Sequence, residues 1–195
     1  MRIPAAGFEM LHEHQYPAYT YLLGMYLGDG CITHEPRTYR LLIYLNRNTP
    51  RIIATCAESV VIVVPHRRVG LVSHGRNCVA VSSYFGGWLA LFPQHGPGKK
   101  HRRSIALEPW QRGLVRSYPG HFVRGCLHSD GCRHRRIVNG KDYPAYSFSN
   151  RSDDISELFC WACRLIGLRP RRATAVTVSI ARRPDVARLD GLMLS

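Results

Sequence analysis

The sequence predicts an α+β fold made of two pseudo-symmetric repeats, each ordered helix, strand, strand, helix, strand, strand, helix (αββαββα). The first observation is an internal repeat, in which residues 22–31 resemble residues 123–132 at an offset of 101. The likeness continues downstream, where residues 44–48 resemble residues 148–152 at an offset of 104. Turn-forming and helix-capping residues also follow one another in the same order in both copies. The same folding unit is therefore expected twice.

The first repeat is expected over residues 17–93, after an N-terminal segment of residues 1–16. Pro17 opens a helix that ends at Asp29, and Pro50 opens the second helix. Apolar-polar alternation bounded by turn residues predicts a hairpin after each of these helices. The elements expected after the first helix are strands at 31–34 and 39–46, a helix to about 61, strands at 67–73 and 78–84, and a helix at 86–92.

The second repeat is expected over residues 117–195, and a basic linker with a connecting helix, residues 94–116, joins it to the first. Only 65 residues follow Asp130, so the sheet and closing helix of this shorter-looped copy are expected to be compact. Asn139-Gly140 is a strong hairpin turn, and Ser152 caps the next helix. The expected elements are a helix ending at 130, strands at 132–138 and 145–149, a helix to about 166, the last strands within 171–181, and a helix at 184–192.

Charge indicates the class of partner. The net charge is +14, and 24 of the 27 cationic residues are arginine, whose planar fork suits phosphates and base edges. This balance favours nucleic acid first and an anionic membrane surface second. Many arginines fall on predicted strands or turns, where a basic β-ribbon fits the major groove, although a solvated strand face is the simpler alternative. The candidate DNA-binding residues are Arg47, Arg67, Arg68, Arg76, Arg133, Arg135, Arg151, Arg171, Arg172, Arg182 and Arg183.

Other classes of protein are disfavoured. The longest apolar run, Val60 to Val64, is too short to span a bilayer, and no apolar stretch of signal-peptide length follows Met1. Seven scattered cysteines, an odd number, argue against a disulfide framework. We therefore expect a monomer located in the cytoplasm with the nucleoid, double-stranded DNA as its partner, RNA as a possible one, and no membrane.

Small residues four apart mark one face of the first helix of each repeat: Gly24 and Gly28 in one copy, Gly125 and Ser129 in the other. This spacing lets two helix backbones approach each other closely. The two helices are therefore expected to form the interface between the repeats.

The same packing would bring Asp29 and Asp130 together at the C-terminal ends of the two helices. Two carboxylates there repel each other and the helix dipoles, unless divalent cations neutralise them. Oxygen ligands and a phosphate substrate suit Mg²⁺, which can activate water and stabilise a leaving oxygen. Either Asp-Gly pair could be only a helix-ending turn, but two at matching positions favour a paired catalytic site.

The two segments resemble the paired motifs of LAGLIDADG homing endonucleases in the single-chain, two-motif form. The motif acids match Asp29 and Asp130, each followed by a glycine, and the sixth motif position is Leu27 and His128 instead of Asp. The resemblance implies a saddle of two antiparallel sheets that straddles duplex DNA, with the motif helices at the repeat interface. It also implies metal-dependent double-strand cleavage at a long target site.

In this family the metal site lies at the ends of the motif helices, which corresponds to Asp29, Asp130, Gly28 and Ser129 here, with Mg²⁺ or another divalent cation as cofactor. The family also keeps a basic residue near each scissile bond. The candidates are Arg182 and Arg183 at the end of the last strand, or the matched pair Arg47 and Arg151, and simple phosphate contact is an equally good interpretation of all four.

Two alternatives to cleavage stay open. The same fold occurs in bacterial transcription regulators that bind DNA without cutting it, and in maturases that bind RNA. Such regulators usually add a helix-turn-helix, which we do not find in the sequence, and commonly lose the motif acids, both of which this sequence keeps. Basic charge alone does not separate DNA binding from RNA binding. A metal-dependent DNA endonuclease is therefore the first hypothesis, and a catalytically silent DNA-binding regulator or a maturase-like RNA-binding protein is the alternative.

Overall fold

The computed structural model describes residues 7–194, so the first six residues of the expected N-terminal segment and the last residue of the second repeat lie outside the described part. The first repeat contains η1 (Glu13–Gln15), α1 (Tyr16–Asp29), β1 (Gly30–Glu35), β2 (Thr38–Asn46), α2 (Pro50–Val63), β3 (Val69–Ser73), β4 (Cys78–Tyr84) and α3 (Trp88–Leu91). The linker contains η2 (Lys100–Arg102) and α4 (Pro109–Ser117). The second repeat contains α5 (Pro119–Asp130), β5 (Gly131–Val138), β6 (Lys141–Ser149), α6 (Asp153–Leu165), β7 (Arg171–Arg172), β8 (Thr177–Ile180) and α7 (Arg183–Leu194).

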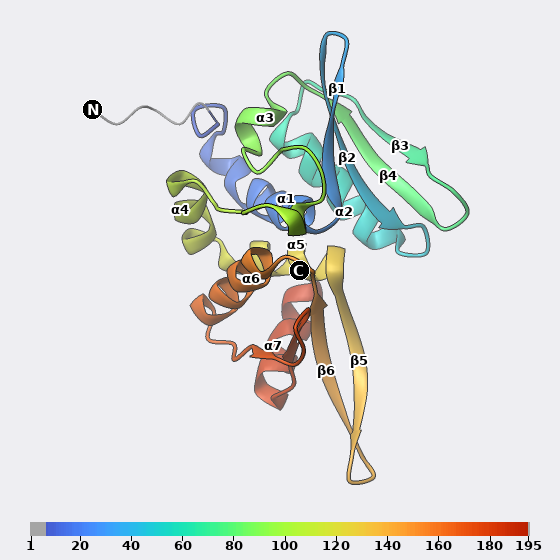
Figure 1. Ribbon diagram of the computed structural model, residues 1–195, viewed down its shortest axis with the longest axis vertical. Helices are drawn as coiled ribbons and strands as arrows, with labels where there is room; N and C mark the ends of the chain where they lie inside the picture. The colour runs from blue at the N-terminus through green and yellow to red at the C-terminus, as the bar shows by residue number, and fades with distance from the viewer. Residues whose placement is uncertain (1–6, 195) are drawn as a thin grey trace.

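Each repeat forms one four-stranded antiparallel sheet, and the strand orders β1-β2-β4-β3 and β5-β6-β8-β7 have the same topology. The first sheet lies in the upper half of Figure 1 and the second in the lower half, with α1 and α5 between them. The pairing starts at equivalent points, because Gly30 pairs with Ile43 and Gly131 pairs with Phe148. The predicted α+β fold with two repeats is confirmed.

The second hairpin of each repeat is where the copies differ. β3 and β4 pair over five residues of β3, whereas β7 pairs with β8 over two.

In the first hairpin of the second repeat, β6 begins at Lys141, four residues earlier than expected, and includes Pro144. A proline is tolerated there because β8 pairs with β6 only from Tyr146 onward, which leaves the neighbouring edge of Pro144 without a ladder.

The helices α1 and α5 form the largest helix–helix contact of the molecule. Nearly the whole circumference of α1 is buried, as expected for a helix between two layers. A Cβ added to Gly24 would lie 2.6 Å from the carbonyl oxygen of Phe122, and one added to Gly125 would lie 2.1 Å from that of Tyr21. Only glycine permits this backbone approach, so the small residues predicted at the interface occupy it.

The linker is fixed to the first repeat by buried hydrogen bonds. Gln94 donates its side-chain amide to the Gln111 side chain (2.6 Å), and Gln111 donates to the Tyr19 hydroxyl (2.8 Å). Farther along, the backbone N–H of Ile105 donates to Asp154 at the start of α6 (2.7 Å). Because both ends of residues 94–105 are anchored, the η2 turn is held against the end of α1. Within residues 7–194 no helix has the length and apolar character needed to cross a bilayer.

Candidate catalytic and DNA-binding site at the repeat interface

The two acids predicted to be catalytic lie at the last residues of α1 and α5, which the helix packing brings to one place. A Cβ on Gly28 would lie 2.2 Å from the Ser129 hydroxyl oxygen and 2.8 Å from a carboxylate oxygen of Asp130. The carboxylate of one repeat therefore lies against the last helical turn of the other. A larger residue at Gly28 would push the two helix ends apart.

Burial makes this acid pair costly to ionise. It raises the pKa of Asp29 to about 7, with the charge of Asp130 as the second cause and Lys100 opposing both. Burial also raises the pKa of Asp130, but a hydrogen bond from Asn150 and the charge of Lys100 act in the other direction. Two half-buried carboxylates at helix C-termini are thus held close together at neutral pH, an arrangement typical of functional sites.

Asn150 positions the acid of the second repeat. Its side-chain amide donates to Asp130 (2.7 Å), and its side-chain oxygen accepts from the backbone N–H of Ser152 (2.8 Å), which fixes the orientation of the amide group. Asn46 is the repeat equivalent and makes the matching turn bond with the backbone N–H of Asn48 (2.9 Å). Among the described residues no hydrogen bond joins Asn46 to Asp29, so the two acids have different neighbours.

Lys100, from the η2 turn of the linker, is a cation whose charge acts on the first acid. Its ammonium group donates to the backbone carbonyls of Tyr26 (2.6 Å), Gly28 (3.2 Å) and Gly30 (2.5 Å). Burial lowers the pKa of Lys100 to about 8, while Asp29 and Asp130 raise it. No local pattern indicates this position, because Lys100 stands beside Lys99 in a basic linker and only the path of that linker brings it to the end of α1.

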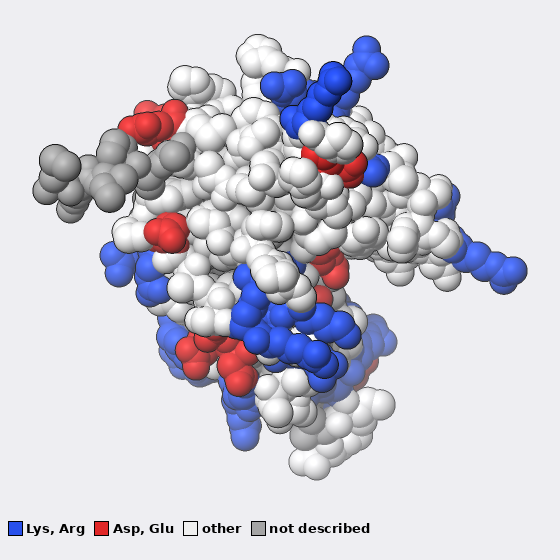
Figure 2. All heavy atoms as spheres, turned by 45° about the horizontal axis from the view of Figure 1, so that its top comes forward, with Lys and Arg blue, Asp and Glu red and all other residues white. Residues whose placement is uncertain are grey.

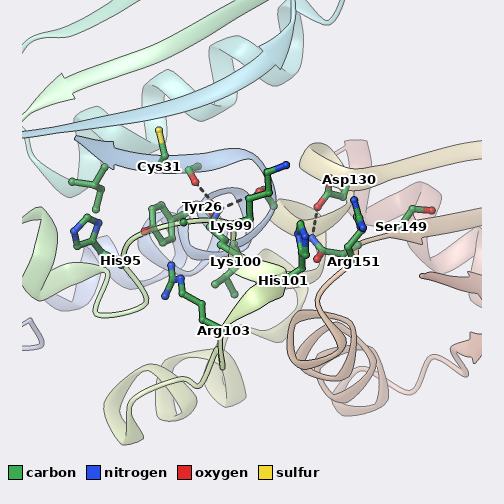
Figure 3. A pocket seen from close by; sticks show the side chains of 17 residues that line it. Tyr26, Cys31, His95, Lys99, Lys100, His101, Arg103, Asp130, Ser149 and Arg151 are labelled. Carbon is green, nitrogen blue, oxygen red and sulfur yellow. Dashed lines mark hydrogen bonds between the residues drawn. The ribbon is translucent and has the colours of Figure 1, made fainter. Parts of the chain in front are cut away.

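A cavity of about 410 Å³ opens beside the acids and is lined by both repeats and the linker (Figure 3). Asp130, Asn150 and Arg151 line it from the second repeat, and Lys100 and His101 line it from the linker. Arg151, a predicted DNA-binding residue, is therefore close to an acid. Its repeat equivalent Arg47 donates instead to the Ser73 hydroxyl (2.8 Å) at the end of β3.

The donor set at the acid pair fits a hard divalent cation only in part. The two carboxylates and the main-chain oxygens of the helix ends are ligands that Mg²⁺ prefers. Among the described residues no group of three or more His, Cys, Asp or Glu lies close enough together to hold a metal ion. Asp29, Asp130 and the helix end at Ser129 leave oxygen atoms available for a metal ion, whereas the Gly28 carbonyl, also predicted to be a ligand, accepts a hydrogen bond from Lys100.

The open face of the second sheet carries a basic groove. His134, Arg136 and Arg171 line it together with Ser147 and Ser179, and its volume is about 610 Å³. Figure 2 shows Lys and Arg side chains gathered below the middle of the view, with others projecting at its upper right. Three further arginines line the groove, from β7 and from the loops before β7 and after β8: Arg172, Arg169 and Arg182. Arg171, Arg172 and Arg182, which the sequence predicted to bind DNA, line this groove together with His134 and Arg136, which were not among the predicted residues.

Arg133 and Arg135 lie on the opposite face of β5 from Arg136, because successive side chains of a strand alternate. Arg133 forms two hydrogen bonds with Asp190 of α7 (2.8 and 3.0 Å), which also accepts from the Tyr146 hydroxyl. Arg135 pairs with Asp142 across the hairpin (3.2 Å). Both predicted DNA-binding arginines thus form ion pairs with acids of their own repeat, on the face of β5 opposite to Arg136.

The other predicted arginines are of two kinds: some contact an aromatic ring or an acid of the protein itself, and others are exposed. Arg183 stacks over the Tyr143 ring (5.3 Å to the ring centre) and Arg67 over Phe85 (5.6 Å). Arg172 also pairs with Asp153 at the start of α6. Arg68 and Arg76 are exposed near the two ends of β3.

The open face of the first sheet has a different character. Its central cation is Arg40, which donates to the Ser82 hydroxyl (2.8 Å) and lies over the Tyr84 ring (5.1 Å to the ring centre). Thr33 and Tyr84 pair in register with Arg40 and share its face. This face is mostly polar and aromatic, and Arg40 was not among the predicted residues.

Solved structures of known proteins share this architecture. A variant of the homing endonuclease I-DmoI, in complex with its target DNA in the presence of Mg, superimposes with a TM-score of 0.63 at 14% identity, covering 94% of this chain and 99% of that one. The LAGLIDADG meganuclease I-AabMI, bound to uncleaved DNA, gives 0.54 at 13% identity over 89% and 82%. The chain has the two-repeat LAGLIDADG fold.

The N-terminal LAGLIDADG domain of DUF199/WhiA matches as well, with a TM-score of 0.56 at 9% identity over 97% of this chain and 85% of that one. No family model matches the sequence, and no curated protein matches it. The LAGLIDADG fold is therefore evident in the arrangement of the elements and in the paired motifs, whereas overall sequence similarity is low.

Proposed function

We propose that this protein binds duplex DNA across its two sheets and makes metal-dependent double-strand cuts between them at a long target site. The observation that carries the proposal is the pair of half-buried acids, Asp29 and Asp130, at the ends of two helices that only glycine lets approach. A helix-ending turn needs neither the burial nor the pairing of these carboxylates. Structures of I-DmoI with target DNA and Mg or Mn support the same use of the fold.

The residues at the helix ends have distinct parts in this proposal. Asp29 and Asp130 would hold Mg²⁺, with the main-chain oxygen of Ser129 beside them. When bound there, Mg²⁺ supplies an acidic water and stabilises the charge of the leaving oxygen. Asn150 fixes the orientation of the Asp130 carboxylate, and Arg151 places a positive charge in the same cavity, where a phosphate can be bound.

The sheets would bind the two arms of the duplex. Each open face continues directly from the helix that ends in an acid, because β1 starts at Gly30 and β5 at Gly131. The arginines of the second sheet neutralise phosphates and read base edges. A DNA affinity that falls steeply with added salt is therefore expected. Because a single chain contains both repeats, a monomer would supply both of the sheets that bind the duplex.

The experiment uses a set of supercoiled plasmids that carry the genomic surroundings of the gene, incubated with and without Mg²⁺. The double variant Asp29→Asn, Asp130→Asn tests the acid pair, and Asp142→Asn, an exposed acid on the β5–β6 hairpin, is the matched control. The expected result is linearisation that needs Mg²⁺, persists in the control and is lost in the double variant. Linearisation by the double variant contradicts the paired-acid mechanism.

A second candidate function is DNA binding without cleavage. The Lys100 ammonium group favours it, because a cation of the chain itself already binds the Gly28 carbonyl beside the acid pair and its charge opposes that of the two carboxylates. Plasmids that are bound and retarded but never cut, with equal affinity for the wild type and the double variant, would support this regulator-like function. Preferential binding of structured RNA in the same assay would support the maturase-like one.

A further inference from the structure

The Lys100 ammonium group has the surroundings of a bound cation. Its three N–H groups have three main-chain carbonyl acceptors, those of Tyr26, Gly28 and Gly30, at 2.5 to 3.2 Å. The Nζ atom also lies 4.8 Å from the centre of the Tyr26 ring, an additional favourable contact for a positive charge. All its donors are therefore used at the end of α1, next to Asp29.

Residues 117–194 of the second repeat place no such cation at the end of α5. The last turn of α5 is capped by the backbone N–H of Gly131, which donates to the Leu127 carbonyl. Among residues 7–194 no lysine or arginine side chain donates to a carbonyl of that turn. Its acid accepts a hydrogen bond from the neutral amide of Asn150 instead. The pseudo-symmetric site is thus electrostatically asymmetric.

We propose that Lys100 is a tethered cation that takes the place of a divalent metal ion at the Gly28 side of the acid pair, so that metal binds mainly at the Asp130 side. Carbonyl oxygens of a helix end and a neighbouring carboxylate are ligands for either an ammonium group or a hard metal ion. Both cations cannot occupy one set of oxygens, and their charges repel each other at short range. This inference rests on the proposed function only in that the acid pair binds a divalent cation.

A purely structural role for Lys100 makes a different prediction. If the ammonium group only anchors the linker to α1, its removal loosens the helix end and lowers or leaves unchanged the affinity for metal. If it replaces a metal ion, its removal frees the Gly28 carbonyl and removes a positive charge that opposes the acids, so metal affinity rises. Lys100→Gln separates the two roles further, because it keeps an N–H donor and removes the charge.

The test measures Mn²⁺ binding to the full chain without DNA, from the decrease in the electron paramagnetic resonance signal of free Mn²⁺. Lys100→Met and Lys100→Gln should each bind Mn²⁺ at least about tenfold more tightly than the wild type. Lys99→Met is the matched control, since it removes the same charge from the exposed neighbouring residue, and its affinity should stay within about twofold of wild type. Adding Asp29→Asn to Lys100→Met should abolish the gain.

The outcomes separate this inference from the proposed function. Tighter Mn²⁺ binding by both Lys100 variants supports the inference even if no plasmid is ever cut. Unchanged or weaker binding by Lys100→Gln, with a thermal unfolding midpoint equal to that of the wild type, overturns it even if the wild type cleaves DNA. An equal gain in Lys99→Met, or no Mn²⁺ binding by any of the proteins, overturns it as well.

Discussion

The two repeats share one topology and differ in their chemistry. In the first, the open face of the sheet is polar and aromatic around Arg40, and the acid lies next to the ammonium group of Lys100. In the second, arginines and a histidine line a groove on the open face, and Asn150 holds the acid. The helices between them are nearly equivalent. The contrast shows that the fold constrains the interface, while each sheet face is free to vary.

The largest expected effect concerns the part of the molecule in which the repeats are equivalent. Gly24→Ala and Gly125→Ala should each lower the free energy of unfolding by about 3 kcal/mol or more, because the added methyl group meets backbone atoms that cannot move aside. Gly113→Ala, on the exposed face of α4 with nothing within 4 Å, is the control and should raise stability by about 0.5 kcal/mol. Urea denaturation measures all three.

A loss confined to one of the two interface glycines would mean that the helices are not equivalent. A decrease in the free energy of unfolding below about 1 kcal/mol for both variants would show that the helix backbones can separate at little cost. The description of α1 and α5 as closely packed at these glycines would then be wrong.

The next effect distinguishes the two acids. The pKa of Asp29 is raised to about 7, whereas an unfolded aspartate titrates near 4, so the folded state keeps a proton that the unfolded state releases in this range. The stability that this proton confers is complete below about pH 4 and is lost as the pH rises through about 7. Without metal, Asp29→Asn should therefore raise the free energy of unfolding by about 2 kcal/mol at pH 8 and hardly at all at pH 4.

Asp130→Asn should raise the free energy of unfolding at pH 8 by less than Asp29→Asn does, because Asn150 already donates to the Asp130 carboxylate and opposes the rise in its pKa. Denaturation curves recorded in the presence of a chelator at both pH values provide the comparison. Equal gains for the two variants would show that the acids have the same surroundings, contrary to the described asymmetry.

The smallest effect tests the assignment of the two faces of β5. Arg136→Gln should lower the slope of log affinity against log salt concentration by about 1, since it removes one phosphate contact. Arg135→Gln changes the same charge on the adjacent residue, which points to the opposite face and pairs with Asp142, and should leave the slope nearly unchanged. Fluorescence anisotropy with a labelled duplex at several salt concentrations measures both, and a larger change for Arg135→Gln would reverse the assignment.

Much of the fold could be predicted because its signals are local. Ser152 accepts from the backbone N–H of Ile155 at the start of α6, as its position before two acids indicated, and Asn139-Gly140 forms the β5–β6 turn with both residues at positive φ. The spacing of Gly24 and Gly125 likewise predicted the helix contact. Each of these depends on residues within one turn or one helix face.

The parts of the site that escaped prediction depend on distant contacts or on strand phase. Lys100 reaches the acids only because Gln94 and Ile105 fix the linker on both sides of it, more than 60 residues from Gly30 in sequence. Arg133 and Arg136 differ by an odd number of residues on one strand, so they point to opposite faces, and the identity of the buried face depends on pairing with β6. Neither the position of Lys100 nor the face to which each arginine points can be predicted from neighbouring residues in the sequence.

The central claim is that one duplex lies across both sheets with the acid pair at its centre, and a hydroxyl-radical footprint tests this most directly. The duplex would be selected from a random library in Ca²⁺, and the footprint of the wild type compared with that of Arg136→Gln, Arg171→Gln. We predict two protected arms around a central segment, with protection in the double variant weakened in one arm only. Equal weakening in both arms, or protection of a single continuous arm, would contradict the account.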